Sequence, residues 1–375
     1  AMELRYDQLT ATQVADSAAA TAHFTPSVTL TGANRVWKAL VVAGRGVLVK
    51  SSSMLASART GVVPALQIVT SGDGFHADDS FLQHVKYAYT GGYGLSFLQN
   101  LVDLLALLAG SAWEVTDPAV DNVYGWIENA YDPFVADGAL MDTVRGREIS
   151  RATFGEHDAG KRLIQTVVVL SEIAPPAEQA WLRPLVKEWI GAAAVRDPLD
   201  SGPLYVLARG SALMADGSIA PRAARLAADV FPDMARVVQH TAAYSAAVAM
   251  TSKTIASYET TNGENLKGFY TGDGALWVYT DDATQFSDDY WATMHPYRVP
   301  GTTVDTLTRA AGSGAGYLPT SSAAYAGGVE SASGLYAVAS YALDAWNSPL
   351  VGRKSWYLFD DEIVALGSGI SAPGQ

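Results

Sequence analysis

The chain has 375 residues, 49% of them hydrophobic and 17% charged, so it is long enough for two domains and too apolar for a disordered or coiled-coil protein. A formal net charge of -13 disfavours nucleic acid, anionic membranes and other polyanions as partners, if every part of the surface follows the average. The lack of cysteine excludes disulfides, thiolate metal sites and cysteine nucleophiles.

The first part of the chain, from Leu9 to about Met234, has helical periodicity. Apolar residues recur three and four positions apart, for example in 97–108 and 163–171, and clusters of Gly, Pro and Asp separate these segments. Strands do not alternate with the helices in this pattern. It therefore predicts helix pairs in an all-α bundle, toroid or solenoid. The apolar stretch 95–113 contains polar residues, so we expect a buried helix there and not a membrane span.

From about Arg236 the sequence becomes rich in Thr, Ser, Tyr and Gly. Short alternating runs such as 274–279 and 354–359 predict antiparallel strands between Gly-rich turns. We therefore predict a helical domain over residues 1–236 and a β domain over residues 237–375. The predicted strands are few for a sandwich, so we expect the β domain to be incomplete. The first residues lack a basic segment followed by an apolar run, so we expect no signal peptide in this sequence.

Three stretches carry polar and aromatic residues that packing alone does not require. The first spans residues 72–94 and places His84 and Tyr93 across a glycine-rich loop, where backbone and ligand can approach closely. A histidine and a tyrosine can act as a base and acid pair. The alternative interpretation is a structural histidine beside turn tyrosines.

The second stretch, 145–151, contains three arginines. If Arg147 opens a helix, Arg147 and Arg151 address the same face, where two guanidiniums could bind a carboxylate or lower the pKa of a nearby phenol from about 10. A surface salt-bridge cluster is the alternative. The third stretch, 258–274, carries two carboxylates and two amides near the predicted domain junction, where ligand clefts are common. Its Asn-Gly pair alone is typical of a hairpin turn.

Taken together, these stretches resemble polysaccharide lyase family 8, which contains the hyaluronate, chondroitin AC and xanthan lyases. The resemblance extends from about residue 7 to residue 370. It is carried by ordered motifs at 31–35, 73–84, 89–94, 145–151, 262–265, 297–303 and 356–362. It implies an incomplete α/α toroid of helix pairs followed by antiparallel β-sandwich structure, which agrees with the change from helices to strands seen in the pattern.

The resemblance also implies an activity and a set of residues. It implies cleavage of a uronic-acid polysaccharide by β-elimination, with neither a metal nor a cofactor. The catalytic asparagine, histidine and tyrosine of the family correspond to Asn34, His84 and Tyr93. Arg147 and Arg151 correspond to the supporting arginines. The acidic residue that holds an arginine corresponds best to Glu259, with Glu264 as the second choice, and contacts with the substrate are expected from Gln83, Arg145, Asn262, Glu264 and Trp277.

The implied reaction explains why these residue types are needed. The C5 proton is removed next to a carboxylate whose negative charge opposes carbanion formation, so a group must neutralise that carboxylate. The Asn34 amide can do so as charge develops. The base is either His84 or an ionised Tyr93, and Tyr93 protonates the O4 leaving group. The sequence leaves the choice of base open.

Substrate, location and partners are expectations from the same resemblance. The spacing from Asn34 to His84 and the intact Asn-Gly-Glu-Asn stretch favour hyaluronan first, chondroitin second and xanthan third. We expect a bacterial, secreted protein whose partner is an acidic polysaccharide and which binds neither nucleic acid nor membranes. Family members have further helices before these motifs and further strands after them, so a second chain that supplies these segments is a further expectation.

Two other functions stay open at this point. Asp281, Asp282, Asp288 and Asp289 could be glycosidase carboxylates, although solvated loop acids or a weak calcium site are the simpler interpretation. A polysaccharide-binding fragment with little turnover is the other. Because three arginines cluster within 145–151, we expect a positive cleft on an otherwise acidic surface.

Overall fold

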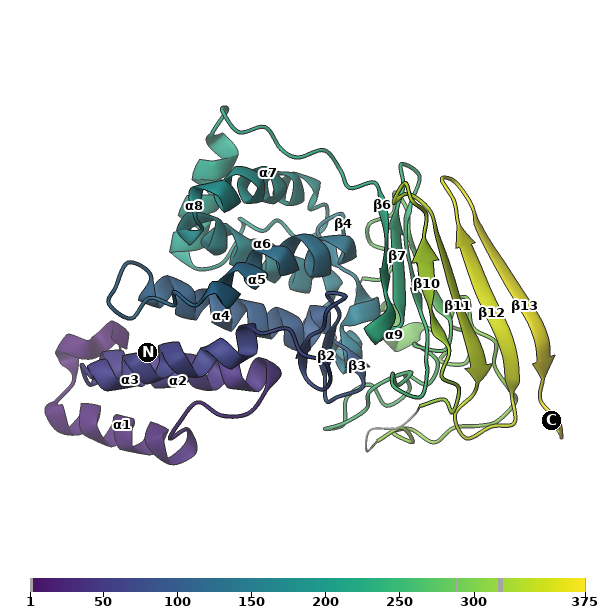
Figure 1. Ribbon diagram of the computed structural model, residues 1–375, viewed down its shortest axis with the longest axis horizontal. Helices are drawn as coiled ribbons and strands as arrows, with labels where there is room; N and C mark the ends of the chain where they lie inside the picture. Colours follow the sequence, from purple (N-terminus) through teal and green to yellow (C-terminus); the bar gives the residue numbers. More distant parts are fainter. Residues whose placement is uncertain (1–2, 288, 316–319, 375) are drawn as a thin grey trace.

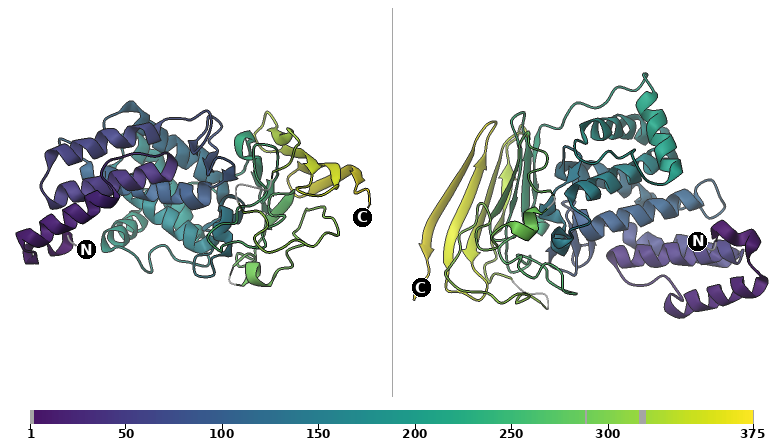
Figure 2. Two further views of the ribbon diagram at one scale, coloured as in Figure 1. Left: turned by 90° about the horizontal axis from the view of Figure 1, so that it is seen from below. Right: turned by 180° about the vertical axis from the view of Figure 1, so that it is seen from behind.

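The computed structural model of the chain describes residues 3–287, 289–315 and 320–374. The helices of the first part lie beside a stack of strands formed by the second part (Figure 1). The first helix and the last strand lie at opposite ends of the molecule, as the further views show (Figure 2). The polar loops that connect the two parts meet between them, and this junction holds the candidate site.

The first part is built from helices joined by short loops. α2 packs on α3 and α4, while α6 packs on α4, α7 and α8, so the helices form a continuous layered body. The helices are α1 (Ala11–Phe24), α2 (Gly32–Leu48), α3 (Ser52–Val62), α4 (Leu95–Leu108), α5 (Asn122–Trp126), α6 (Glu156–Ile173), α7 (Pro176–Ala192) and α8 (Leu204–Ala215). The prediction of a helical first domain is confirmed.

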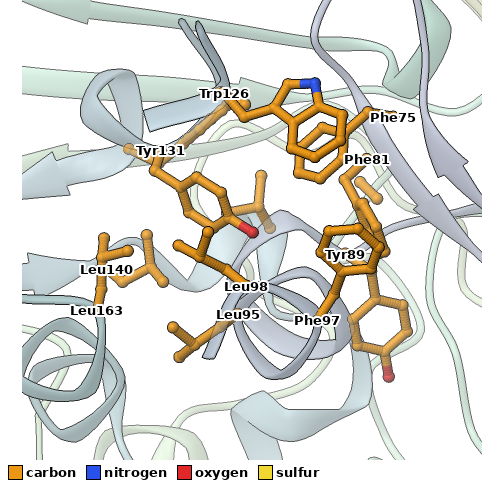
Figure 3. Packing of buried hydrophobic residues seen from close by; sticks show 14 of the residues in the cluster. Phe75, Phe81, Tyr89, Leu95, Phe97, Leu98, Trp126, Tyr131, Leu140 and Leu163 are labelled. Carbon is orange, nitrogen blue, oxygen red and sulfur yellow. The ribbon is translucent and has the colours of Figure 1, made fainter. Parts of the chain in front are cut away.

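The core of the helical part surrounds α4, the most apolar of these helices. Residues 90–108 are long and apolar enough to cross a membrane, yet most of this segment is buried inside the protein, as the sequence analysis expects. Beside α4, the rings of Phe75 and Trp126 stack with centroids 4.0 Å apart. The hydroxyl of Tyr89 points away from the other side chains of this cluster (Figure 3). The packed apolar side chains therefore support the Tyr89 hydroxyl at the edge of the core.

Two small antiparallel sheets interrupt the helices, which differs from the prediction of an all-helical first part. One contains β1 (Gly74–Phe75), β2 (Phe81–Gln83) and β3 (Tyr87–Ala88), and the other contains β4 (Val135–Ala136) and β5 (Ala139–Leu140). Strands of two or three residues are too short for an alternating pattern to show in the sequence. The hairpin between β2 and β3 carries His84.

The second part contains two four-stranded antiparallel sheets, each with its strands in chain order. Gly328 lies against the other sheet so closely that an added Cβ would stand 2.9 Å from a methyl group of Val237. The two sheets therefore pack face to face as a sandwich. One sheet contains β6 (Ala227–Phe231), β7 (Arg236–His240), β8 (Ser245–Ala249) and β9 (Ala275–Tyr279), the short helix α9 (Tyr290–Thr293) follows, and the other contains β10 (Ala326–Glu330), β11 (Ala337–Asp344), β12 (Val351–Leu358) and β13 (Ile363–Ser371).

The change from helices to strands comes earlier than the predicted boundary near residue 236. α8 ends at Ala215 and β6 begins at Ala227, so β6 lies within the range 1–236 that the sequence analysis assigned to the helical domain. The first three residues of β6 are Ala-Ala-Asp, which have low strand propensity. The strand forms because it pairs along its whole length with β7, a contact that local sequence does not reveal.

Candidate active site

His84 is at the tip of the hairpin that joins β2 to β3. Its backbone has a φ of 52°, in the left-handed region that side-chain-bearing residues seldom adopt. The imidazole Nδ1 donates a hydrogen bond of 2.6 Å to Oε1 of Glu259. In a neutral imidazole with its proton on Nδ1, Nε2 carries the lone pair. The carboxylate thus fixes both the orientation of the ring and the nitrogen that can accept a proton.

Tyr93 lies in a π-helical turn, Thr90–Gly94, directly before α4. Its ring stands edge-on to the His84 ring, with centroids 4.9 Å apart, and packs against Trp37 of α2 at 5.7 Å. The turn is tightly enclosed, because a Cβ on Gly91 would stand 2.7 Å from the Arg145 side chain. The small residues of this turn therefore let the phenol approach the imidazole.

Arg147 connects the phenol to two carboxylates. It lies in a 3₁₀ turn, Gly146–Ser150, and its guanidinium is buried. Nη2 donates to the Tyr93 hydroxyl at 3.2 Å, Nη1 to Glu259 Oε2 at 2.7 Å, and Nε to Glu264 Oε2 at 2.6 Å. A guanidinium N–H that points at the phenol oxygen stabilises negative charge on that oxygen.

Arg151 shares one of these carboxylates. Its Nε donates to Glu264 Oε1 at 2.6 Å, so Arg147 and Arg151 converge on Glu264 from the same side. The sequence analysis expects both arginines on one face; the turn that achieves this is 3₁₀, and the carboxylate they bind belongs to the protein. Hydrogen bonds from Arg151 and Arg147 hold the pKa of the Glu264 carboxyl below its ordinary value.

Glu259 is the centre of the cluster. It comes from the long segment between β8 and β9, and its side chain is fully buried. Burial alone would raise the pKa of its carboxyl, but hydrogen bonds from His84 and Tyr89 and the charge of Arg147 outweigh burial and lower that pKa. Glu259 is therefore ionised at neutral pH and accepts bonds from three side chains at once.

Tyr89 is a member of the cluster that the sequence analysis did not select. Its hydroxyl donates to Glu259 Oε2 and accepts from the backbone N–H of Arg147 at 3.1 Å and from its Nη1 at 3.2 Å. Burial and the charge of Glu259 raise its pKa well above the ordinary value, so it stays protonated and remains a donor. Gly92 and Gly146 leave space for the ring, since a Cβ on either would overlap it. These two glycines are the signal in the sequence that could have indicated Tyr89.

Asn34 lies in the first turn of α2 and is half-buried. Two neighbours place it beside the cluster: Trp37, one turn later, packs on Tyr93, and Gly32 lies against Gln83, which precedes His84. Among the described residues, none forms a hydrogen bond with the Asn34 amide. Its polar atoms are available to a ligand.

Three residues from which substrate contacts were expected do not join this cluster. Gln83 is fully buried and donates its amide to Asp73 at 2.8 Å. Arg145 is also buried and donates to Asp142 and to the Phe154 carbonyl oxygen. Trp277 is on the face of β9 that carries Tyr279, which bonds to Glu156 of α6, and has 3% of its surface exposed. Each side chain is enclosed by the core, so none offers a face to a polymer, which corrects the expectation.

Asn262 and Glu264 keep positions near the junction. Asn262 is exposed in a turn and has a φ of 56°, and Gly263 follows with a φ of 77°, as in the hairpin-type turn that an Asn-Gly pair suggests. Asn265, three residues after Asn262, is buried and donates its side-chain amide to the Glu259 carbonyl oxygen at 2.9 Å. This turn therefore holds the backbone of Glu259 and presents Asn262 to solvent.

The expected positive cleft is not what the ion pairs show. Arg145 pairs with Asp142, Arg147 with both glutamates of the cluster, and Arg151 with Glu148 and Glu264. The positive charges in 145–151 are therefore balanced by carboxylates of the protein. The family resemblance implies a glutamate of the β part beside an arginine, and the structure places two there, Glu259 and Glu264, so that little positive charge is left unbalanced.

A cavity of about 440 Å³ lies between the two parts of the chain, next to the arginines of the cluster. Arg151 and His157 line it from the helical part, and Asn265, Lys267 and Trp291 line it from the β part. Its volume fits the range of small-molecule sites, and its lining combines cations, amides and an aromatic ring. Of the cluster, Arg151 lines this cavity, whereas Asn34, His84 and Tyr93 do not.

The acids proposed for a glycosidase have another role where they are described. Asp282 accepts from the Thr284 backbone N–H at 3.0 Å and from its hydroxyl, which closes an exposed turn. Asp281 is exposed beside it, and Asp288 lies outside the described residues. Within the described ranges, no three His, Asp or Glu side chains are grouped so that they could hold a metal ion. Asp282 thus provides turn structure.

Comparison with known proteins places both parts of the chain in one family. Residues 2–188 match the N-terminal alpha-helical domain of polysaccharide lyase family 8, and residues 227–375 match the super-sandwich domain of the same family. A xanthan lyase of Bacillus sp. (strain GL1) is 42% identical over 374 residues, which are 98% of this chain and 39% of that protein. A hyaluronate lyase of Thermasporomyces composti is 41% identical over 347 residues, which are 91% of this chain and 44% of that protein.

Solved structures give the same result. The Paenibacillus xanthan lyase superposes with a TM-score of 0.93 at 39% identity, covering 100% of this chain and 35% of that one. The Streptomyces coelicolor A3 chondroitin AC lyase superposes with a TM-score of 0.93 at 38% identity, covering 100% of this chain and 53% of that one. The chain therefore spans about a third to a half of the length of these relatives.

Proposed function

Because the chain belongs to polysaccharide lyase family 8, we propose that it cleaves a uronic-acid-containing polysaccharide by β-elimination, without a metal or cofactor. One observation carries the proposal: Glu259 binds both His84 and Arg147, and Arg147 donates to Tyr93. An imidazole, a phenol and a guanidinium are thereby fixed around one point. This is the set of groups needed to remove one proton and to deliver another.

Proton removal is assigned to Tyr93 for a glucuronate substrate. In such a sugar the C5 hydrogen and O4 lie on the same face, so one group can take the proton and then protonate the leaving oxygen. The Arg147 N–H that donates to the Tyr93 oxygen holds the phenol in place beside His84 for both steps. His84, with its ring 4.9 Å from the Tyr93 ring, lies close enough to contact the same sugar and is the base in the alternative assignment.

Neutralising the substrate carboxylate is assigned to Asn34. As the C5 proton leaves, charge moves onto that carboxylate, and an amide that donates to it stabilises the developing aci-carboxylate. Asn34 suits this role because no described residue engages its amide and because it lies beside the ring pair. Its contribution should therefore be larger in the transition state than in the bound substrate.

Hyaluronan is the proposed first substrate, with chondroitin next. Similarity to a hyaluronate lyase at 41% identity and to a chondroitin AC lyase structure with a TM-score of 0.93 supports this choice. The second candidate function is cleavage of xanthan instead of a glycosaminoglycan, and it is favoured by 42% identity to a xanthan lyase. Because each of these is a polymer too large to enter a cell intact, we propose that the protein acts outside the cell.

An ultraviolet assay separates these possibilities. Elimination creates a C4–C5 double bond conjugated to the uronate carboxylate, and this chromophore absorbs in the ultraviolet. We expect the absorbance to rise with hyaluronan, more slowly with chondroitin and least with xanthan. A rise with xanthan alone would favour the second candidate. Binding of all three polymers without any rise would contradict the proposed activity and would favour a polysaccharide-binding fragment.

A further inference from the structure

The tip of the β2–β3 hairpin is strained at the residue that the proposed function uses. His84 and Val85 are consecutive and have φ values of 52° and 71°, and Val85 is β-branched. Such backbone conformations are costly for residues with a side chain and persist only where the surroundings impose them. Glu259 holds the His84 ring, but a bond to the ring does not hold the backbone. The Lys86 backbone N–H donates to the His84 carbonyl oxygen at 2.9 Å, and a side chain from outside the hairpin adds to this hold.

Asp73 binds the residues on both sides of His84. Its Oδ2 accepts from the Gln83 amide Nε2 at 2.8 Å, and its Oδ1 accepts from the Val85 backbone N–H at 2.8 Å. The two oxygens of one carboxylate thus bracket the histidine along the chain. Because both partners are neutral donors to an ionised acceptor, these are charge-assisted bonds of the stronger kind.

Asp73 and Gln83 also contact the start of α2. Gly32, its first residue, has a φ of 51°, and an added Cβ would stand 2.8 Å from Gln83 Oε1 and 3.1 Å from Asp73 Cβ. Asn34 follows two residues later. The Gln83 oxygen is buried and accepts no hydrogen bond from the described residues, so packing against the helix start and the bond to Asp73 fix this side chain.

We propose that Asp73 is a positioning residue that holds the strained backbone of His84 and aligns the α2 start that carries Asn34. It acts through Val85 and Gln83 and touches neither the substrate nor the reacting atoms. This inference rests on the proposed function. It assigns two carboxylates to the support of His84: Glu259 orients the imidazole ring, and Asp73 holds the backbone. The inference also gives the buried Gln83 a role, because the Gln83 side chain bonds to Asp73 and packs against the start of α2.

Two substitutions of Asp73 distinguish positioning from general stability. Asp73→Ala removes both acceptors and should leave His84 misplaced. We therefore expect kcat on hyaluronan to fall about 10- to 100-fold, with KM changed less than about twofold. Asp73→Asn should restore kcat to within about threefold. Its oxygen can still accept from Val85, and the Gln83 amide can turn so that its unpartnered oxygen accepts from the new amide.

The matched control is Asp78→Ala, on the same segment. Asp78 accepts from Ser80 and from the Asp233 backbone N–H and does not contact the hairpin tip. It should leave kcat unchanged. Equal losses in Asp73→Ala and Asp73→Asn, or a lower Tm with unchanged kcat in Asp73→Ala, would overturn the proposal.

Amide hydrogen exchange gives a measurement that does not depend on turnover. In Asp73→Ala, exchange should become faster in the peptide covering 81–88 and stay unchanged in the α4 peptide covering 97–108; Asp73→Asn should resemble the wild type. Unchanged exchange in 81–88 would overturn the role of Asp73 even if the protein is an active lyase. If the wild type yields no unsaturated product but exchange in 81–88 becomes faster in Asp73→Ala, the proposed function is wrong and the structural role of Asp73 is still supported.

Discussion

The helical part and the β part contribute different kinds of groups to the site. The helical part supplies side chains that can exchange a proton or bind an anion, whereas the β part supplies carboxylates that bind those side chains. The first set is Asn34, His84, Tyr89, Tyr93, Arg147 and Arg151, and the second is Glu259 and Glu264. The helical domain therefore provides the groups to which the proposed reaction is assigned, and the β domain orients those groups and balances their charge.

This division depends on how the two parts dock. Away from the cluster, Tyr279 of β9 donates to Glu156 of α6 at 2.9 Å, and Arg236 of β7 donates to the Thr143 carbonyl oxygen at 3.0 Å. These buried contacts fix β7 and β9, the two neighbours of β8 in the sheet, and Glu259 is on the segment between β8 and β9. The position of Glu259 is therefore a property of the whole interface and not of its own loop.

Tyr93→Phe should have the largest effect, because it removes the group assigned to both proton transfers. We expect kcat to fall by about 10³-fold or more while the fold is kept, since general acid–base groups contribute roughly 10²–10⁴-fold. Formation of unsaturated product measures activity, and circular dichroism with Tm measures the fold. Near-normal turnover in this variant would remove Tyr93 from the mechanism.

Asn34→Ala comes next and tests the second reactive group of the helical part. We expect kcat to fall about 100-fold with KM nearly unchanged, because the amide acts on charge that develops only in the transition state. Steady-state kinetics on hyaluronan give both values. A rise in KM with unchanged kcat would mean that Asn34 only binds the substrate.

Glu259→Gln tests whether the β part controls the helical groups. The amide is the same size but uncharged, so it loses the pairing with Arg147 and the strong acceptor for His84. We expect kcat to fall roughly 30- to 100-fold, somewhat less than for Asn34→Ala. If kcat is unchanged, the division of roles between the two parts is wrong, because the helical groups then work without the carboxylate.

Glu264→Gln is the matched comparison within the same segment. Glu264 binds Arg147 and Arg151 but not His84, so only one side of the network loses a partner. We expect a roughly tenfold lower kcat, smaller than for Glu259→Gln. An effect larger than that of Glu259→Gln would reverse the ranking of the two glutamates and make the Arg151 side the main support.

The smallest expected effect is a dependence of stability on pH. The pKa of the Glu264 carboxyl is lower in the folded protein than its ordinary value of about 4.3, because Arg151 and Arg147 bind it. Its contribution is therefore present above that ordinary value and is lost as pH falls through the folded pKa. Tm of the wild type should exceed that of Glu264→Gln near neutral pH, and the gap should close in acid. A constant gap from neutral pH to about pH 3 would contradict this assignment.

The sequence indicates the helical contribution well and the β contribution less well. Asn34, His84, Tyr93 and the two arginines are predicted through the family resemblance, because each lies in a compact motif formed by one stretch of chain. Glu259 and Glu264 lie five residues apart, and the sequence cannot assign the supporting role to one of them. Both take part, because a turn at Asn262 and Gly263 brings the two carboxylates to the same guanidinium.

Burial explains the residues that were misplaced or missed. Gln83, Arg145 and Trp277 are polar or aromatic and lie near site motifs, but their neighbours enclose them. Tyr89 and Asp73 were not selected because their partners are far away in the chain or act through backbone N–H groups. The change from helices to strands was placed too late because pairing with β7, and not local propensity, makes β6 a strand.

The most direct test compares bond breakage with double-bond formation during digestion of hyaluronan by the wild-type chain. New reducing ends and new ultraviolet-absorbing uronates are counted in the same samples. The account predicts one unsaturated uronate for every new reducing end, with both lost in Tyr93→Phe. New reducing ends without the chromophore would show hydrolysis and would contradict β-elimination by this site.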